Sequence, residues 1–80
     1  MKQVYILDCL MDGDETKTQI LEFFEFIHQP ILESELDVLL EEMMCDGLIT
    51  VNYKWQNEKG EFPFCKTEKG KQLWEQAAFE

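Results

Sequence analysis

The chain has 80 residues, of which 45% are hydrophobic and 12% aromatic, and its formal net charge is −10. This length predicts one domain, residues 1–80, and the composition excludes a wholly disordered chain. No apolar run approaches the roughly 20 residues of a membrane-spanning helix. The negative charge and the absence of arginine exclude a broadly basic surface of the kind that usually binds nucleic acid.

The first predicted helix covers residues 2–12, because apolar side chains recur there at helical spacing. They are Val4, Ile6, Leu7, Leu10 and Met11. Thr16 followed by Gln19 forms a capping-box pattern, which predicts a second helix from about Lys17 to His28. Pro30 prevents that helix from continuing. Its predicted core face consists of Ile20, Phe23, Phe24 and Ile27.

A third helix is predicted between Ser34, which with Asp37 resembles a capping box, and Gly47, which suits a left-handed C-terminal position. Leu48 would supply the apolar contact that usually follows such a glycine. The inward face is Leu36, Leu39, Leu40 and Met43. The outward face carries no lysine or arginine and consists of Glu35, Val38, Glu41, Glu42 and Cys45.

After Gly47 the apolar period changes to two, which predicts a strand over residues 49–56, a turn over 57–60 and a returning strand over 61–66. Pro63 predicts that the returning strand is an edge strand. A four-residue turn would place three pairs opposite each other: Gln56 with Glu61, Trp55 with Phe62, and Tyr53 with Phe64. Thr67 is expected to cap a last helix that runs from Glu68 to about Phe79.

Three stretches together resemble a winged helix-turn-helix domain, an α+β fold with three helices, a two-stranded wing hairpin and a C-terminal helix. LESELDVLLEEMMCDGLI resembles a recognition helix with its glycine and strand, and VNYKWQNEKGEFPFCKT resembles the wing. KTEKGKQLWE is similar to the T-x-K-G-x-x-L segment of PadR-like and MarR-like bacterial transcription regulators. The resemblance implies that the third helix lies in the major groove and that the wing contacts phosphate or the minor groove.

Several groups of residues are candidates for binding. On the third helix the base-facing positions would be Glu35, Val38, Glu41 and Glu42, and phosphate should repel these acids. They form a candidate partner-binding surface together with Trp55 and Phe62. The candidate DNA contacts are Lys17, Lys54, Lys59 and Lys66, which are otherwise ordinary solvated charges. A candidate dimer seam, or else the edge of the core, is Phe26, Trp74 and Phe79.

Two functions are therefore compared. The first is a small acidic protein of transcription-regulator type that acts mainly through protein contacts, as a dimer or with a basic partner that it meets as a mimic of DNA. The alternative is a dimeric repressor that contacts DNA through the wing and the third helix. A weaker third option is an inert domain that completes a larger complex.

No enzyme, cofactor or metal is expected, because the sequence has no nucleophile–base pair, phosphate loop or metal cluster of familiar spacing. Three widely spaced cysteines predict free thiols and a cytoplasmic protein; they are Cys9, Cys45 and Cys65.

Overall fold

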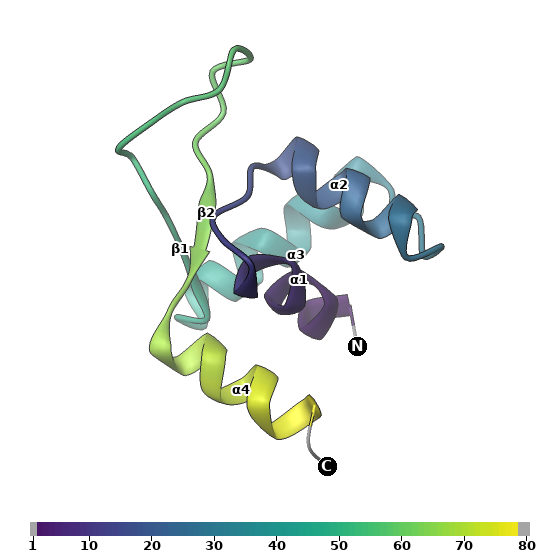
Figure 1. Cartoon of the computed structure of the whole chain (residues 1–80), viewed down its shortest axis with the longest axis vertical. Coiled ribbons are helices and arrows are strands. Elements are labelled where there is room, and N and C mark those ends of the chain that lie inside the picture. The colour runs from purple at the N-terminus through teal and green to yellow at the C-terminus, as the bar shows by residue number, and fades with distance from the viewer. Residues whose placement is uncertain (1, 79–80) are drawn as a thin grey trace.

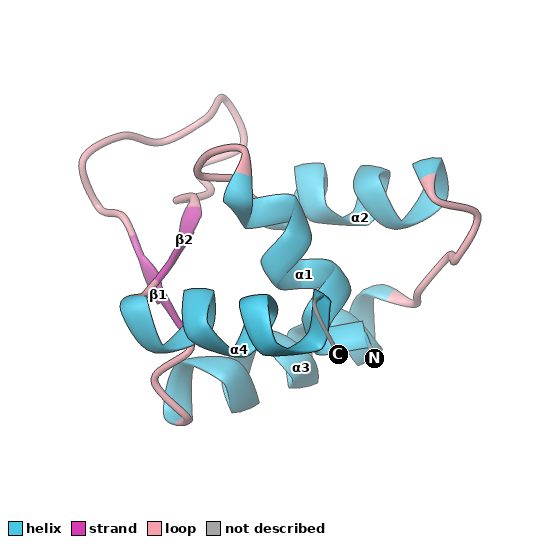
Figure 2. Cartoon of the chain, turned by 60° about the horizontal axis from the view of Figure 1, so that its bottom comes forward, coloured by secondary structure: helices cyan, strands magenta, loops and turns pink. Residues whose placement is uncertain are grey.

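The computed structural model describes residues 2–78, in which four helices and a short antiparallel hairpin follow one another in the predicted order (Figure 1). The elements are α1 Lys2–Met11, α2 Lys17–Phe26, α3 Glu33–Cys45, β1 Ile49–Val51, β2 Phe64–Lys66 and α4 Glu68–Ala78. Figures 1 and 2 both show α1 between α2 and α4. No helix within residues 2–78 is long and apolar enough to cross a membrane. The predicted α+β arrangement of three helices, a hairpin and a last helix is confirmed.

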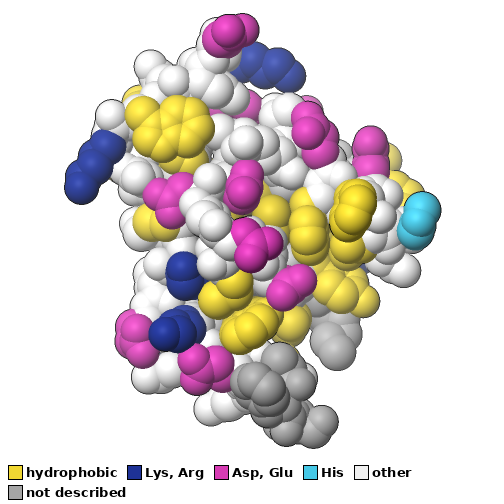
Figure 3. All heavy atoms as spheres, viewed as in Figure 1, with side chains coloured by type: hydrophobic (Ala, Val, Ile, Leu, Met, Phe, Trp, Pro, Cys, Tyr) yellow, Lys and Arg dark blue, Asp and Glu magenta, His cyan; other side chains and the backbone are white. Residues whose placement is uncertain are grey.

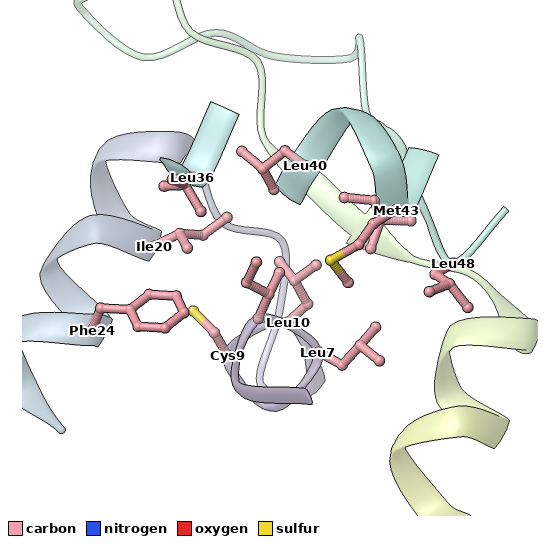
Figure 4. Packing of buried hydrophobic residues seen from close by; sticks show 11 residues of the cluster. Leu7, Cys9, Leu10, Ile20, Phe24, Leu36, Leu40, Met43 and Leu48 are labelled. Atoms are coloured by element: carbon pink, nitrogen blue, oxygen red, sulfur yellow. The ribbon is translucent and has the colours of Figure 1, made fainter. Parts of the chain in front are cut away.

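The core is built around α1 and receives side chains from α2, α3 and the start of β1 (Figure 4). Its buried members are Ile6, Leu7, Cys9, Leu10, Ile20, Phe24, Leu36, Leu40, Met43, Leu48 and Ile49. Cys9 is buried on α1, whereas Val4 and Met11, which were predicted to face inward, are only partly buried. The predicted face of α1 was too narrow, because α2 and α4 cover this helix from two sides.

Both ends of α2 are closed by local hydrogen bonds. The predicted capping box is confirmed: the Thr16 hydroxyl accepts from the Gln19 N–H, and the Gln19 side chain accepts from the Thr16 N–H at 2.8 Å. At the other end His28 has a φ of 59°. The N–H of Gln29 donates to the Phe24 carbonyl at 2.9 Å, so a histidine occupies the left-handed position of a Schellman ending.

The two ends of α3 differ in how well they were predicted. The predicted cap at Ser34 is wrong, since the N-cap is Leu32 and no side chain caps the helix. Asp37 accepts a hydrogen bond from Lys17 at 3.1 Å, so it belongs to a contact with α2. The predicted C-terminal ending is confirmed, because Gly47 has a φ of 74° and Leu48 donates to the Met43 carbonyl at 2.9 Å.

The hairpin register differs from the prediction by two residues. Val51 lies opposite Phe64, whereas Tyr53 had been expected there. The shift is even, so each side chain keeps its face of the hairpin. Tyr53 instead packs edge-on against Phe62, with ring centroids 5.0 Å apart. The loop is longer than expected because regular pairing stops at Val51.

The strand β2 is not the edge strand that Pro63 predicted. Phe64 donates to the Glu15 carbonyl at 2.8 Å, and Glu15 donates to the Phe64 carbonyl at 3.1 Å. The segment before α2 therefore pairs with β2 on the side opposite β1. Pro63 is tolerated because it precedes this pairing, and its carbonyl still accepts from Asn52 at 2.8 Å.

Candidate nucleic-acid and partner interface

The T-x-K-G segment at the start of α4 fixes the end of α3. The Thr67 hydroxyl lies 2.6 Å from the Gly47 carbonyl oxygen, to which it donates, and it accepts from the Gly70 N–H at 3.1 Å. Lys69 Nζ donates to the Asp46 carbonyl at 2.8 Å, where a cation also complements the negative end of the α3 dipole. The threonine and the lysine thus join the C-terminus of α3 to the N-terminus of α4.

The glycine of this segment permits a close approach of two backbones. A Cβ atom at Gly70 would lie 2.1 Å from the Leu48 carbonyl oxygen and 3.0 Å from Leu7 Cδ2. The Thr67 N–H donates to the same Leu48 carbonyl at 3.1 Å. Only glycine fits at this position while α4 stays against the chain that connects α3 to the wing. The segment therefore sets where α3 and the wing lie relative to the core.

The outer face of α3 is open and acidic, as predicted. A shallow depression there is lined by Val38, Glu41, Glu42, Cys45 and Asp46. Val38 is 56% exposed although it is apolar. Glu35 was grouped with these residues, but it is partly buried and forms an ion pair with Lys2 of α1. Three of the four predicted positions of α3 thus share one surface, and the fourth faces the start of α1.

The four candidate DNA-contacting lysines do not form one patch. Lys17 lies beside α3, where its ammonium is 3.1 Å from Asp37 and 3.4 Å from Glu33. The hydrogen bond to Asp37, assisted by the charges of both acids and opposed by partial burial, raises the pKa of Lys17. Lys54 and Lys59 are exposed in the loop of the hairpin. The fourth lysine, Lys66, is partly buried at the end of β2.

The wing aromatics are arranged differently from the prediction. Tyr53, which was predicted to lie in a strand opposite Phe64, is 73% exposed in the loop. Trp55, a candidate partner-binding residue, is 45% exposed but lies in the loop instead of the predicted strand. Phe62, the other aromatic candidate, is partly buried against the Tyr53 ring. The exposed aromatic surface of the wing is therefore formed by Tyr53 and Trp55.

Glu61 anchors the wing to α2, and sequence reasoning missed this role. Its Oε1 accepts from Thr18 Oγ1 and from Asn57 Nδ2, both at 2.8 Å. The Asn57 side chain also accepts from the Glu61 N–H at 2.8 Å, which closes the tip of the loop. Burial alone would raise the pKa of Glu61, but these hydrogen bonds, with the charges of Lys59 and Lys17, hold it below its ordinary value. Asn57, four residues before Glu61, is a residue typical of turns, so the local contact could have been predicted. Nothing in the sequence near Glu61 indicates its contact with Thr18.

The residues of the candidate dimer seam do not share one surface. Phe26 is 80% exposed at the end of α2. Trp74 of α4 packs against the core, and its indole N–H donates to Asp8 of α1 at 3.1 Å. Figures 1 and 2 show α1 between α2 and α4, so Phe26 and Trp74 belong to helices on opposite sides of α1. Phe79 lies outside the described residues.

The three cysteines are unpaired. Burial, followed by the charges of Glu15, Asp12 and Asp8, raises the pKa of the Cys9 thiol to about 12. Cys9 is therefore a protonated core side chain at neutral pH and a poor nucleophile. Within residues 2–78 no group of three or more histidine, cysteine or acidic side chains is placed to hold a metal ion.

Comparison with known proteins identifies the fold. No protein-family model and no curated protein sequence matches this chain. A crystal structure of a PadR family transcription regulator from hypervirulent Clostridium difficile R20291 matches 96% of this chain and 82% of its own, with a TM-score of 0.85 and 20% identity. Bacillus subtilis PadR in complex with operator DNA matches 98% of this chain, with a TM-score of 0.83 and 22% identity. The chain covers 45% of that second protein.

These likenesses show that the chain has the winged-helix fold of PadR regulators, as the T-x-K-G-x-x-L segment predicted. In the terms of that fold, α3 is the third helix and the hairpin from β1 to β2 is the wing.

Proposed function

We propose that this chain is a transcription-regulator module that contacts DNA through α3 and the wing. The observation that carries the proposal is the likeness of 98% of the chain to Bacillus subtilis PadR, a protein whose structure contains operator DNA. The sequence alone favoured a function through protein contacts over DNA binding. The likeness supports the alternative, a DNA-binding repressor, more strongly.

The ion pairs of α3 reduce the electrostatic objection to DNA binding. Lys17 pairs with Glu33 and Asp37, and Lys2 pairs with Glu35, so lysines from α1 and α2 accompany the acids in the first half of the helix. Repulsion of phosphate would then come mainly from Glu41 and Glu42 in the second half. A glutamate in the major groove can also accept a hydrogen bond from the amino group of cytosine, which is a base-specific contact.

The wing would supply the attraction. Lys54 and Lys59 are exposed in its loop, and Trp55 beside Lys54 offers an aromatic face. Two phosphate contacts predict a salt dependence with a slope of about −2 in a plot of log affinity against log salt concentration. Two phosphate contacts give only weak binding for one copy of the chain. The proposal therefore includes a cytoplasmic homodimer, which brings two wings to one operator. Sedimentation velocity at increasing concentration tests the dimer.

The test is a fluorescence-anisotropy titration of a labelled duplex at low salt. The double variant Lys54→Glu with Lys59→Glu should weaken binding at least tenfold, whereas neutralisation by Glu41→Gln with Glu42→Gln should strengthen it. A variant with Glu68→Gln and Glu75→Gln, both on α4, changes the net charge equally without touching α3 or the wing, and serves as the control. Absence of binding by every protein at the lowest salt would reject the proposal.

A second candidate function is contact with a basic protein through the outer face of α3. It is favoured by the depression that Val38 shares with the acids, since no lysine lines it among the described residues. A lysine-rich peptide that binds the wild type, but not Glu41→Gln with Glu42→Gln, would support this function if DNA binding is absent.

A further inference from the structure

A second open groove lies between α1 and α2, and no residue of α3 or of the wing lines it. It is lined by Cys9, Asp12, Glu15, Gln19, Glu22, Phe23 and Phe26. The four residues from α2 follow helical spacing and therefore form one face of that helix. Figure 3 shows apolar side chains over α1 and α2 with acidic side chains around them. None of the residues that line this groove belongs to the surfaces proposed above to contact DNA.

The groove combines a fixed aromatic residue with a free one. Phe23 is partly buried and packs edge-on against Phe24, with ring centroids 6.3 Å apart, so the core holds it in place. Phe26, one turn later, is 80% exposed, more than any other large apolar side chain described. Isolated exposed apolar residues are ordinary, but an exposed aromatic ring beside a groove with an aromatic wall is typical of a binding surface.

The border of the groove carries negative charge only. Asp12, Glu15 and Glu22 supply three carboxylates, and no lysine lines the groove among the described residues. Burial, together with the charges of Asp12 and Asp14, raises the pKa of Glu15 above its ordinary value. Asp12 therefore repels Glu15 at the border of the groove, and a cation brought there would relieve that repulsion.

We propose that this groove docks an amphipathic helix of another protein, with apolar side chains that meet Phe23 and Phe26 and lysine or arginine side chains that meet the acids. A helix laid in an apolar groove is a common mode of peptide recognition, and a cation over a phenylalanine ring adds to it. A second copy of this chain is a poor occupant. Its net charge is −10, and three of the four lysines on its helices already have partners: Lys2, Lys17 and Lys69.

The test uses a synthetic amphipathic helical peptide of about 16 residues, with a leucine stripe flanked by lysines, and a control peptide with glutamate in place of lysine. Binding is measured by isothermal titration calorimetry at physiological ionic strength with the 80-residue chain. Phe26→Ser and the double variant Asp12→Asn with Glu22→Gln should each weaken binding at least tenfold. Neither change reaches the core, because all three side chains are exposed.

Matched controls outside the groove and outside the acidic face of α3 separate a local site from general attraction. Leu32→Ser removes another exposed apolar side chain, and Glu68→Gln with Glu75→Gln on α4 removes the same charge as the groove variant. Both should change affinity less than twofold. Equal weakening by the two charge variants, or an unchanged affinity for Phe26→Ser, would overturn the proposal. So would self-association of the wild type that Phe26→Ser abolishes, because a second copy would then be the occupant.

Discussion

Substitution of Gly70 by alanine should destabilise the domain, although helix propensity alone favours alanine at this position by about 1 kcal/mol. The new Cβ would lie 2.1 Å from the Leu48 carbonyl oxygen, which belongs to backbone and cannot rotate away. The start of α4 must therefore move outward. That movement lengthens the hydrogen bonds that Thr67 makes to Gly47 and Leu48.

The magnitude follows from these terms. Overpacking against a fixed neighbour costs about 1–3 kcal/mol, and each weakened hydrogen bond costs about 1 kcal/mol. After subtraction of the gain in propensity, the free energy of unfolding should fall by about 2–4 kcal/mol. Urea unfolding at 25 °C, followed by circular dichroism, measures this change. Gln72→Ala, on the exposed side of the same helix, is the control and should stay within about 0.5 kcal/mol of wild type. A Gly70→Ala protein as stable as wild type, or more stable, would refute the close approach of α4 to Leu48.

Three further substitutions have defined outcomes. His28→Gly should raise the free energy of unfolding by about 0.5–1 kcal/mol, because a left-handed conformation costs a side chain more than glycine loses in unfolded-state entropy; a lower urea midpoint would contradict this. Thr16→Ala should lower it by about 1–2 kcal/mol through loss of the capping box, and an unchanged thermal midpoint would count against that cap. Glu61→Gln should destabilise the domain by less than about 1 kcal/mol at pH 7. The folded pKa of Glu61 is lowered, so its contribution is present above the unfolded pKa and disappears as pH falls through the folded pKa. The wild-type and Glu61→Gln midpoints should therefore converge on acidification, and a difference that grows toward low pH would show the opposite sign.

The features that sequence reasoning predicted correctly depend on residues close together in the chain. The capping box of Thr16 and Gln19 spans one turn of helix, and the ending at Gly47 needs only the residues beside it. The T-x-K-G segment pointed to the fold only through its resemblance to known regulators. The structure gives its physical meaning, because the threonine, the lysine and the glycine each contact the end of α3 or the residue that follows it.

The features that were predicted wrongly depend on contacts between distant segments. The side chain that appeared to complete a cap with Ser34 binds Lys17 of another helix. The edge assignment of β2 failed because Glu15, far back in the chain, pairs with Phe64. Periodicity does not reveal such partners, since it reports only which side of an element is apolar.

The candidate site was predicted in part for the same reason. The acidic outer face of α3 follows from helical spacing alone, and the structure brings three of its four predicted positions together. The engagement of Lys17 and Glu35 in ion pairs could not be predicted, because it depends on how α1 and α2 pack against α3. The groove between α1 and α2 was likewise missed, although Phe26 had been named as a candidate residue of a dimer seam.

The most direct measurement of the central claim, that α3 and the wing form the DNA-contacting surface, is an NMR titration of isotope-labelled protein with an unlabelled duplex at low salt. The account predicts amide shift changes concentrated at the exposed residues of α3 and in the loop that carries Lys54 and Lys59, with α4 unaffected. Shift changes that spare both segments, or a spectrum that the duplex leaves unchanged, would contradict the account.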